Sequence, residues 1–342
     1  MHRPTIRDLA DASGLSVATV NRVLAGAGGV RQATMQRVMA AAQSIGFYGV
    51  GAIQSRVAAA RAKYRFGFLL HQPSRAFYQN LAKAIRSAAE GMEACEIEAR
   101  IEFLEDLSPQ NTASRMIALG AECDAIGVVA AVHPLVTQAI AELQNLGKPV
   151  FALISQLAAT GQVHYIGLEH WKVGRTAAWA IEHICAGPGK LGILVGNHRY
   201  RCQEMNETGF RSYFREHAPA FTLLEPLSTF ETTAVAQEMT EKLLREHPDL
   251  AGLYVAGGGI TGALAGLRSG GRAGQVVVVG YELMDVTRTA LLDGTLTFVI
   301  SHPLPRLAEE AITKMVRAVN SGSKEGNYTS ILPFEIYTRE NI

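Results

Sequence analysis

One short segment carries four side chains that could contact the bases of DNA. They are Val17, Ala18, Asn21 and Arg22, and helical spacing places them on one outward face. Arg22 could make a bidentate contact to guanine, the methyl groups of Val17 and Ala18 could meet a thymine methyl, and Asn21 could reach an adenine edge. This combination predicts sequence-specific recognition of a DNA major groove.

Two short helices are needed to present these side chains. Thr5 can cap a helix over residues 6–12, and Ser16 can cap a second helix over residues 17–24. Gly14, within the connection, permits a left-handed turn between them. Two helices joined in this way form a helix-turn-helix unit, whose second helix enters the major groove. A third amphipathic helix over residues 31–42 would offer Arg31 to phosphates.

The charge distribution supports a separate DNA-binding module. The chain has 342 residues and a net charge of +1, but residues 1–63 carry eight Lys and Arg against two acidic residues. That segment is therefore +6, and the remaining 279 residues are −5. A basic head on a mildly acidic body predicts a nucleic-acid-binding domain joined to a domain of another kind.

Other features restrict the protein class. The four cysteines lie far apart, which argues against a disulfide scaffold and a cysteine-based zinc site. The start of the chain has no secretory signal, and no apolar run reaches the length of a membrane span. We therefore expect a soluble cytoplasmic protein with reduced thiols and no membrane association.

From residue 64 onward, apolar runs typical of buried strands alternate with amphipathic segments. This alternation predicts two parallel sheets covered by helices, with a ligand in the crevice at the carboxyl ends of their strands. The expected strands are 66–70, 99–103, 125–129, 149–153, 165–167, 191–195, 221–225, 252–255, 276–280 and 296–301. The expected helices include 77–91, 136–145, 171–184, 205–217 and 233–247.

A glycine-rich motif supports an alternative function. Residues 257–262 satisfy G-x-G-x-x-G after an expected strand, and Glu282 ends the next strand, where it could bind a ribose hydroxyl. This pattern would fit an NAD-dependent oxidoreductase. Against it, the motif comes too late in the chain for a full nucleotide domain, and it leaves the basic head unexplained. No metal-binding or G-x-S-x-G spacing is present. We therefore predict no catalytic residue, metal or cofactor, and no enzyme.

The basic head closely resembles the headpiece of LacI/GalR-type transcription regulators. The resemblance rests on residues 5–10 (TIRDLA) and 14–24 (GLSVATVNRVL), and it continues through residues 41–47, although Asn21 stands where the family has Ser. It implies that Val17, Ala18 and Arg22 touch base edges and that Thr5, Thr19, Asn21 and the third helix touch the backbone. The predicted DNA contacts are Thr5, Ser16, Val17, Ala18, Thr19, Asn21, Arg22, Arg31, Arg56, Val57 and Ala58.

The last three of these contacts lie in an expected hinge over residues 49–63. In the family a Pro-Asn pair precedes the hinge helix, and Gly49-Val50 replaces it here. Ala58, with Val57 beside it, falls where the family has a leucine that wedges into the minor groove. The helical stretch has little to bury alone, so we expect it to fold on contact with DNA.

The body is similar to the type I periplasmic-binding-protein fold over residues 66–337, which implies a small polar effector in the cleft. Phe77 and Tyr78 match aromatic residues that stack on sugars, and Arg75 replaces a family asparagine, which favours an anionic group on the ligand. The predicted effector contacts are Arg75, Phe77, Tyr78, His133, Gln156, Glu169, Trp171, Arg199, Arg201, Glu282 and His302.

These observations predict a small all-α helix-turn-helix domain (1–48), a hinge (49–63) and a two-lobed α/β periplasmic-binding-protein-like domain with parallel sheets (64–342). The resemblance implies a homodimeric transcriptional repressor that binds double-stranded operator DNA and responds to a small sugar-like effector. A sugar-type solute-binding receptor and the NAD-dependent oxidoreductase remain the alternatives.

Overall fold

The computed structural model describes residues 3–26, 30–59, 61–159, 161, 163–321 and 328–342, and only the backbone of Gln32 and of residues 55–59. The chain divides into two compact units. One comprises Met1–Tyr64 with Met92–Ile97, and the other comprises Arg65–Gly91 with Glu98–Ile342. Within the described residues, no helix is both long and apolar enough to span a membrane.

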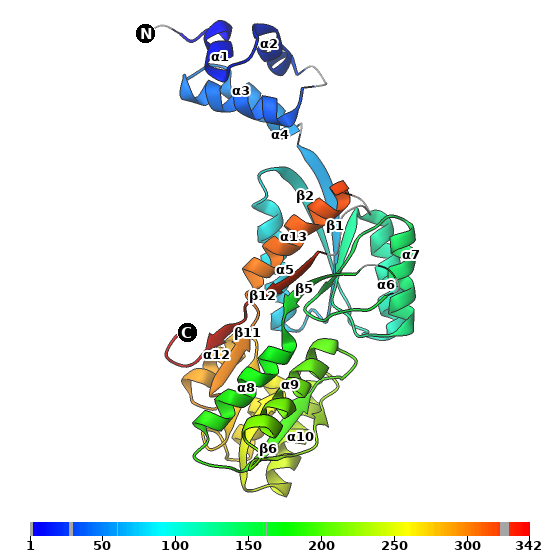
Figure 1. Ribbon diagram of the computed structural model, residues 1–342, viewed down its shortest axis with the longest axis vertical. Helices are drawn as coiled ribbons and strands as arrows, with labels where there is room; N and C mark the ends of the chain where they lie inside the picture. Colours follow the sequence, from blue (N-terminus) through cyan, green and yellow to red (C-terminus); the bar gives the residue numbers. More distant parts are fainter. Residues whose placement is uncertain (1–2, 27–29, 60, 160, 162, 322–327) are drawn as a thin grey trace. The chain divides into compact units, whose positions relative to one another are not determined.

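The first unit contains the three helices expected of the head and a fourth that follows them (Figure 1). They are α1 (Ile6–Ser13), α2 (Val17–Ala25), α3 (Gln32–Ser44) and α4 (Val50–Ala59). Both predicted caps are present. The Thr5 hydroxyl accepts a hydrogen bond from the Asp8 amide at 3.3 Å, and the Ser16 hydroxyl accepts one from the Thr19 amide at 3.2 Å. Gly14 ends α1 at φ 62°, where a side chain would be strained.

A small apolar core holds these helices together. Leu9, Val20 and Val38 from α1, α2 and α3 are fully buried in it. Ile53 of α4 is also fully buried in the same cluster. The helix over residues 50–59 therefore packs an apolar side chain against the head. This contact was not predicted from the sequence, which led us to expect a helix with little to bury.

The second unit contains two lobes, each built on a largely parallel sheet, as predicted. The first sheet has the strand order β12-β5-β4-β3-β1-β2. Its strands are β1 (Ala62–Leu70), β2 (Cys95–Phe103), β3 (Ala125–Val128), β4 (Val150–Leu153), β5 (His164–Leu168) and β12 (Thr329–Leu332). The pairs β1–β3, β3–β4, β4–β5 and β12–β5 are all parallel, and the β1–β3 register aligns Phe66 with Ala125.

Helices cover both faces of this sheet (Figure 1). The pair α6 (Pro109–Glu122) and α7 (Pro134–Asn145) lies on one side, and the pair α5 (Ala76–Glu90) and α13 (Leu304–Ser321) lies on the other. Fully buried residues such as Met116, Ile126 and Ile140 form the core between α6, α7 and the sheet. The strands are continuously apolar because both of their faces are covered.

The second sheet follows the order β13-β11-β10-β9-β6-β7, with β8 also paired to β6. Its strands are β6 (Lys190–Val195), β7 (Thr222–Leu223), β8 (Leu227–Ser228), β9 (Leu250–Val255), β10 (Val277–Tyr281), β11 (Phe298–Ser301) and β13 (Glu335–Tyr337). Its pairs are parallel except β11–β13, which is antiparallel. The helices of this lobe are α8 (His170–Ile184), α9 (Arg201–His217), α10 (Thr233–Glu246), α11 (Ile260–Ser269) and α12 (Asp285–Leu292).

The chain passes between the lobes three times, after β5, after β11 and after β12. The connections from β5 to α8 and from β11 to α13 place His170 and His302 at two of these crossings. The carboxyl ends of the parallel strands therefore face a cleft between two covalently linked lobes, which is where ligands bind in sheets of this kind.

All ten expected strands are present, with bounds that differ by a few residues. The expectation missed β8, β12 and β13, which are only two to four residues long. Unlike the similarly short β3 and β4, these strands lack a continuous buried apolar run, and pairing with a neighbouring strand defines them instead.

Candidate functional site

The outward face of α2 presents the side chains predicted to contact bases. Val17 is 42% exposed although it is apolar, and Ala18, Asn21 and Arg22 are also exposed. Thr19 is half-buried, and its hydroxyl lies 2.9 Å from that of Ser16. Val17 opens this capped helix and Arg22 lies in its last turn, and both side chains are exposed. An exposed apolar group and a guanidinium on such a helix are suited to the edges of base pairs.

A shallow groove continues this face across the head. Thr5 and Val17 line it, as do three residues that the sequence interpretation did not include, Arg3, Arg7 and Tyr48. The Tyr48 side chain is 72% exposed and lies against Phe47, with ring centroids 4.5 Å apart. Two arginines and an exposed aromatic hydroxyl in a groove can donate hydrogen bonds to phosphate oxygens.

The other predicted DNA contacts lie elsewhere. Arg31 is exposed at the start of α3. Arg56, Val57 and Ala58 belong to α4, but their side chains lie outside the described part of the chain. A further arginine has a structural partner, since the Arg37 guanidinium donates to the Ser13 carbonyl at 2.8 Å and so holds the turn between α1 and α2.

The cleft between the two lobes contains a cavity of about 740 Å³. This volume lies within the range of small-molecule sites. Residues that follow β1, β4, β6, β8, β9 and β10 form much of its wall. Four of the predicted effector contacts line it, namely Arg75, Phe77, Tyr78 and Glu282.

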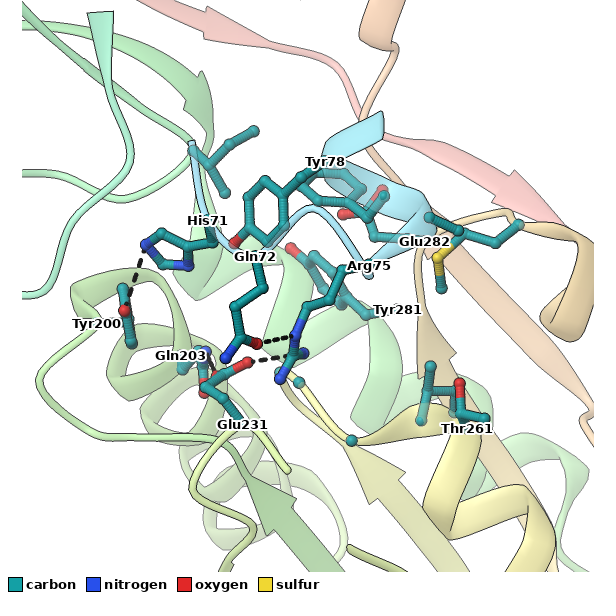
Figure 2. Close-up of a pocket in the computed structure, with 18 of the residues that line it drawn as sticks. His71, Gln72, Arg75, Tyr78, Tyr200, Gln203, Glu231, Thr261, Tyr281 and Glu282 are labelled. Atoms are coloured by element: carbon teal, nitrogen blue, oxygen red, sulfur yellow. Dashed lines mark hydrogen bonds and ion pairs between the residues drawn. The ribbon is translucent and has the colours of Figure 1, made fainter. Parts of the chain in front are cut away.

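A chain of polar side chains crosses the cavity from one lobe to the other (Figure 2). The Arg75 guanidinium donates to Gln72 Oε1 at 2.9 Å and to Glu231 Oε2 at 3.1 Å. The Gln203 amide donates to the other Glu231 oxygen at 2.6 Å. In turn, Gln203 Oε1 accepts hydrogen bonds from the amides of Gly196 and Asn197 at 2.7 and 3.0 Å. Both oxygens of the Glu231 carboxylate therefore have partners.

Aromatic rings form another part of the wall. The Phe77 and Tyr78 rings meet edge to face at 5.0 Å, and His71 lies between Tyr78 and Tyr200 with centroids 4.9 and 5.2 Å away. His71 Nε2 donates to the Val129 carbonyl at 3.0 Å. Burial lowers the pKa of His71 to about 3, so the ring is neutral at pH 7. Faces of this kind suit the C–H surface of a sugar ring.

Buried polar groups connect the lobes at the crossing after β5. His170 Nε2 donates to the Ile154 carbonyl at 2.8 Å, and its Nδ1 lies 3.3 Å from the Tyr281 hydroxyl, which can donate to it. Burial lowers the pKa of His170 to about 3, so the ring is neutral at pH 7. Ile154 adopts φ 65°, a strained backbone for a β-branched residue, at the point where its carbonyl receives His170.

Glu282 and His302 form a pair at the second crossing. His302 Nδ1 lies 2.5 Å from Glu282 Oε1, and the other carboxylate oxygen accepts from the Ser301 hydroxyl and the His302 amide, each at 3.1 Å. His302 is fully buried and, in the part of the chain described, its Nε2 has no hydrogen-bond partner. Glu282 lines the cavity, but both oxygens of its carboxylate are already hydrogen-bonded to Ser301 and His302 at the crossing.

The other predicted effector contacts lie outside the cavity wall. His133 caps α7 by accepting from the Leu135 amide at 3.2 Å, and Trp171 lies under the Arg175 guanidinium at 4.7 Å. Glu169 precedes α8 and is half-buried. The remaining three, Gln156, Arg199 and Arg201, are exposed.

The glycine motif serves packing in this fold. A Cβ on Gly258 would lie 1.8 Å from Glu231 Oε2, and a Cβ on Gly257 would lie 2.2 Å from Gln203 Oε1. Glycine at these positions lets both side chains lie across the loop. The Glu231 carboxylate then covers the surface that a dinucleotide pyrophosphate would need, and its charge would repel that group.

Sequence reasoning missed several residues of the wall. His71, Gln72, Tyr200, Gln203 and Glu231 line the cavity, and none belongs to a motif with a fixed spacing. The signal that could have found His71 and Gln72 is their place at the end of the first strand. Glu231 follows β8, a two-residue strand that the sequence pattern does not reveal.

Comparison with known proteins agrees with both halves of this description. Residues 66–324 match the family described as periplasmic binding protein domain, and residues 5–49 match the bacterial regulatory proteins of the lacI family. Neither description is that of an enzyme. The D-apiose import binding protein of Paraburkholderia graminis is 22% identical over 205 residues, which are 59% of this chain and 65% of that protein.

Solved structures share the fold of the body. An ABC transporter solute-binding protein from Agrobacterium vitis, bound with α-D-tagatopyranose, superposes with a TM-score of 0.74 at 19% identity, covering 81% of this chain and 95% of that one. A protein from Bacteroides fragilis, assigned as a LacI transcriptional regulator, gives 0.72 at 23% identity, covering 82% and 98%. The chain therefore belongs to the periplasmic binding protein domain family, and ahead of that domain it carries the helix-turn-helix domain of the lacI family of bacterial regulatory proteins.

Proposed function

We propose that this protein is a sequence-specific transcriptional repressor whose affinity for operator DNA changes when a small sugar-like molecule binds in the cleft. The observation that carries this proposal is the presence, in one chain, of a capped recognition helix with an exposed Val17 and Arg22 and of a two-lobed domain with a cavity of about 740 Å³. DNA binding alone would not require the cavity, and ligand binding alone would not require the recognition helix.

The headpiece supports base recognition in a defined way. Arg22 would contact a guanine, and Thr5, Ser16, Thr19, Asn21 and Arg31 would hold the backbone or adjoining bases. Operator sites for such heads are two-fold, so we propose that the protein acts as a homodimer in the cytoplasm. The hinge residues Arg56, Val57 and Ala58 would lie near the minor groove.

The cavity supports the sugar-like effector. Phe77 and Tyr78 offer ring faces, and Gln72, Gln203 and the Arg75–Glu231 pair offer hydrogen-bonding groups to hydroxyls. The relative from P. graminis is described as a D-apiose import binding protein, and the solute-binding protein from A. vitis holds a tagatose. Binding between the lobes would change their separation, and the two states would hold the headpieces differently over the operator.

A solute-binding receptor is the second candidate, because the body resembles solute-binding proteins of transporters. The head distinguishes the two. Fluorescence anisotropy with DNA from the region upstream of the gene should show salt-sensitive binding that is tighter than binding to random DNA. Equal affinity for the two DNAs would refute the regulator.

A matched pair of arginine variants makes this experiment sharper. Arg22→Ala should weaken binding to the specific DNA by about 1–3 kcal/mol and relax the sequence preference. Arg31→Ala removes a charge of the same kind on α3, and it should weaken binding to both DNAs uniformly. If Arg22→Ala behaves like Arg31→Ala, Arg22 does not read a base.

A further inference from the structure

The charged groups on the cavity wall are predominantly acidic. Among the described residues that line it, Arg75 is the sole arginine or lysine, whereas Glu231 and Asp285 carry carboxylates and a third, Glu282, is paired with His302. His71 is buried and neutral, so it adds no positive charge. The sequence led us to expect that Arg75 would attract an anionic group, and this wall gives that expectation little support.

The partner of Arg75 removes the remaining basis for an anionic ligand. Its guanidinium lies 3.1 Å from Glu231 Oε2, and the two side chains are only 24% and 12% exposed. Partial burial reduces solvent screening, so the carboxylate compensates the positive charge far better than an exposed partner would. An incoming phosphate or carboxylate would have to compete with a carboxylate that is already in place.

The fold holds Glu231 in that position. Glu231 and the preceding Phe230 have φ values of 60° and 49°, so two consecutive residues other than glycine adopt the left-handed region. Such strain persists only where the surrounding structure enforces it. Gln203, itself held by two backbone amides, donates to the carboxylate oxygen that Arg75 does not contact, at 2.6 Å. The absence of a side chain at Gly258 leaves room for the carboxylate.

We propose that Glu231 determines the charge class of the effector, so that the cavity accepts neutral polyhydroxy compounds and excludes their phosphorylated and acidic counterparts. This inference rests on the proposed function only in taking the cavity as the effector site. Glu231 occupies the anion position beside Arg75, while both side chains still offer hydrogen-bonding groups to hydroxyls. Arg75 in turn positions the carboxylate and links the two lobes.

Inorganic phosphate is a suitable probe, because the natural ligand need not be known. Glu231→Gln keeps the shape and the bond to Gln203 but removes the charge. The full-length variant should bind phosphate at least about tenfold more tightly than wild type, measured by calorimetry and by thermal stabilisation. Adding Arg75→Gln should abolish the gain. Glu231→Asp, which keeps the charge, and Glu225→Gln, a carboxylate that is 93% exposed outside the cavity, should behave like wild type.

Two outcomes of these measurements would overturn the proposal. One is that Glu231→Gln binds phosphate no more tightly than wild type, and the other is that the gain persists without Arg75. A comparison on the wild-type protein keeps the proposal testable even if the variants fail to fold. Its thermal stabilisation by D-ribose and D-allose is compared with that by D-ribose 5-phosphate and D-gluconate. Greater stabilisation by either anionic compound would also overturn the proposal. None of these measurements involves DNA, so a failure of the DNA-binding experiment would refute the regulator and leave this inference standing.

Discussion

The two neutral histidines of the cleft predict a specific dependence of stability on pH. Burial lowers the pKa values of His71 and His170 to about 3 in the folded chain, whereas an unfolded histidine titrates near about 6.5. Below pH 6.5 the unfolded chain binds protons that the folded chain does not. The stability from each histidine is therefore complete above pH 6.5 and is lost as the pH falls toward the folded pKa.

The size of the effect follows from these values. Between about pH 7.5 and pH 5.5, protonation of one unfolded histidine lowers the free energy of unfolding by about 1.4 kcal/mol, and two lower it by about 2.7 kcal/mol. The interval lies above the range in which carboxylates such as Asp106 and Asp249 titrate, because hydrogen bonds lower their pKa values further. The histidines should therefore dominate the change.

Urea denaturation followed by tryptophan fluorescence measures this change in the correct part of the chain. Both tryptophans, Trp171 and Trp179, lie on α8, so their fluorescence reports unfolding of the two-lobed unit and not of the head. His71→Gln and His170→Gln keep a donor for the carbonyl partner and should each remove about half of the pH dependence.

A wild-type free energy of unfolding that stays constant over this interval would refute the reasoning. The same conclusion would follow if both variants retained the full wild-type slope, since the protons would then bind elsewhere.

Other predictions address the head and the cavity. Ser16→Ala removes the acceptor of the Thr19 amide and should lower the stability of the head by about 1 kcal/mol in a circular-dichroism melt; an unchanged melt would show that the cap contributes nothing. Ile53→Ala should cost about 2–5 kcal/mol and speed amide exchange in α4, whereas unaltered exchange would contradict its anchoring on the head. Phe77→Ala should abolish the response to effector but preserve DNA binding. The control Trp179→Ala removes a ring that is 50% exposed outside the cavity and should retain the response; if Phe77→Ala also retains it, the Phe77 ring does not contact the effector.

The head could be predicted closely because its determinants are local. Caps at Thr5 and Ser16, the left-handed turn at Gly14 and the apolar spacing of α1 and α2 all act within a few residues. The burial of Ile53 could not be predicted in the same way. It depends on where the chain places α4 after Phe47, which is a tertiary contact without a sequence pattern.

The cavity shows a comparable division. The strands and their alternation with helices predicted the two sheets and the cleft, and the predicted effector contacts Phe77 and Tyr78 belong to the cavity wall. The Arg75–Glu231 pair joins residues 156 positions apart, so no local sequence pattern predicts it. The polar residues Gln156, Arg199 and Arg201 were plausible from their positions after strands, but they are exposed and do not belong to the residues that line the cavity.

The central claim is that a ligand in the cleft changes the affinity of the head for DNA. The most direct measurement is the dissociation constant of the full-length protein for its own upstream DNA, with and without a saturating neutral sugar that raises its melting temperature. The account predicts a shift of about fivefold or more, and the same factor in sugar affinity when DNA is bound. An unchanged dissociation constant at saturating sugar would contradict the account.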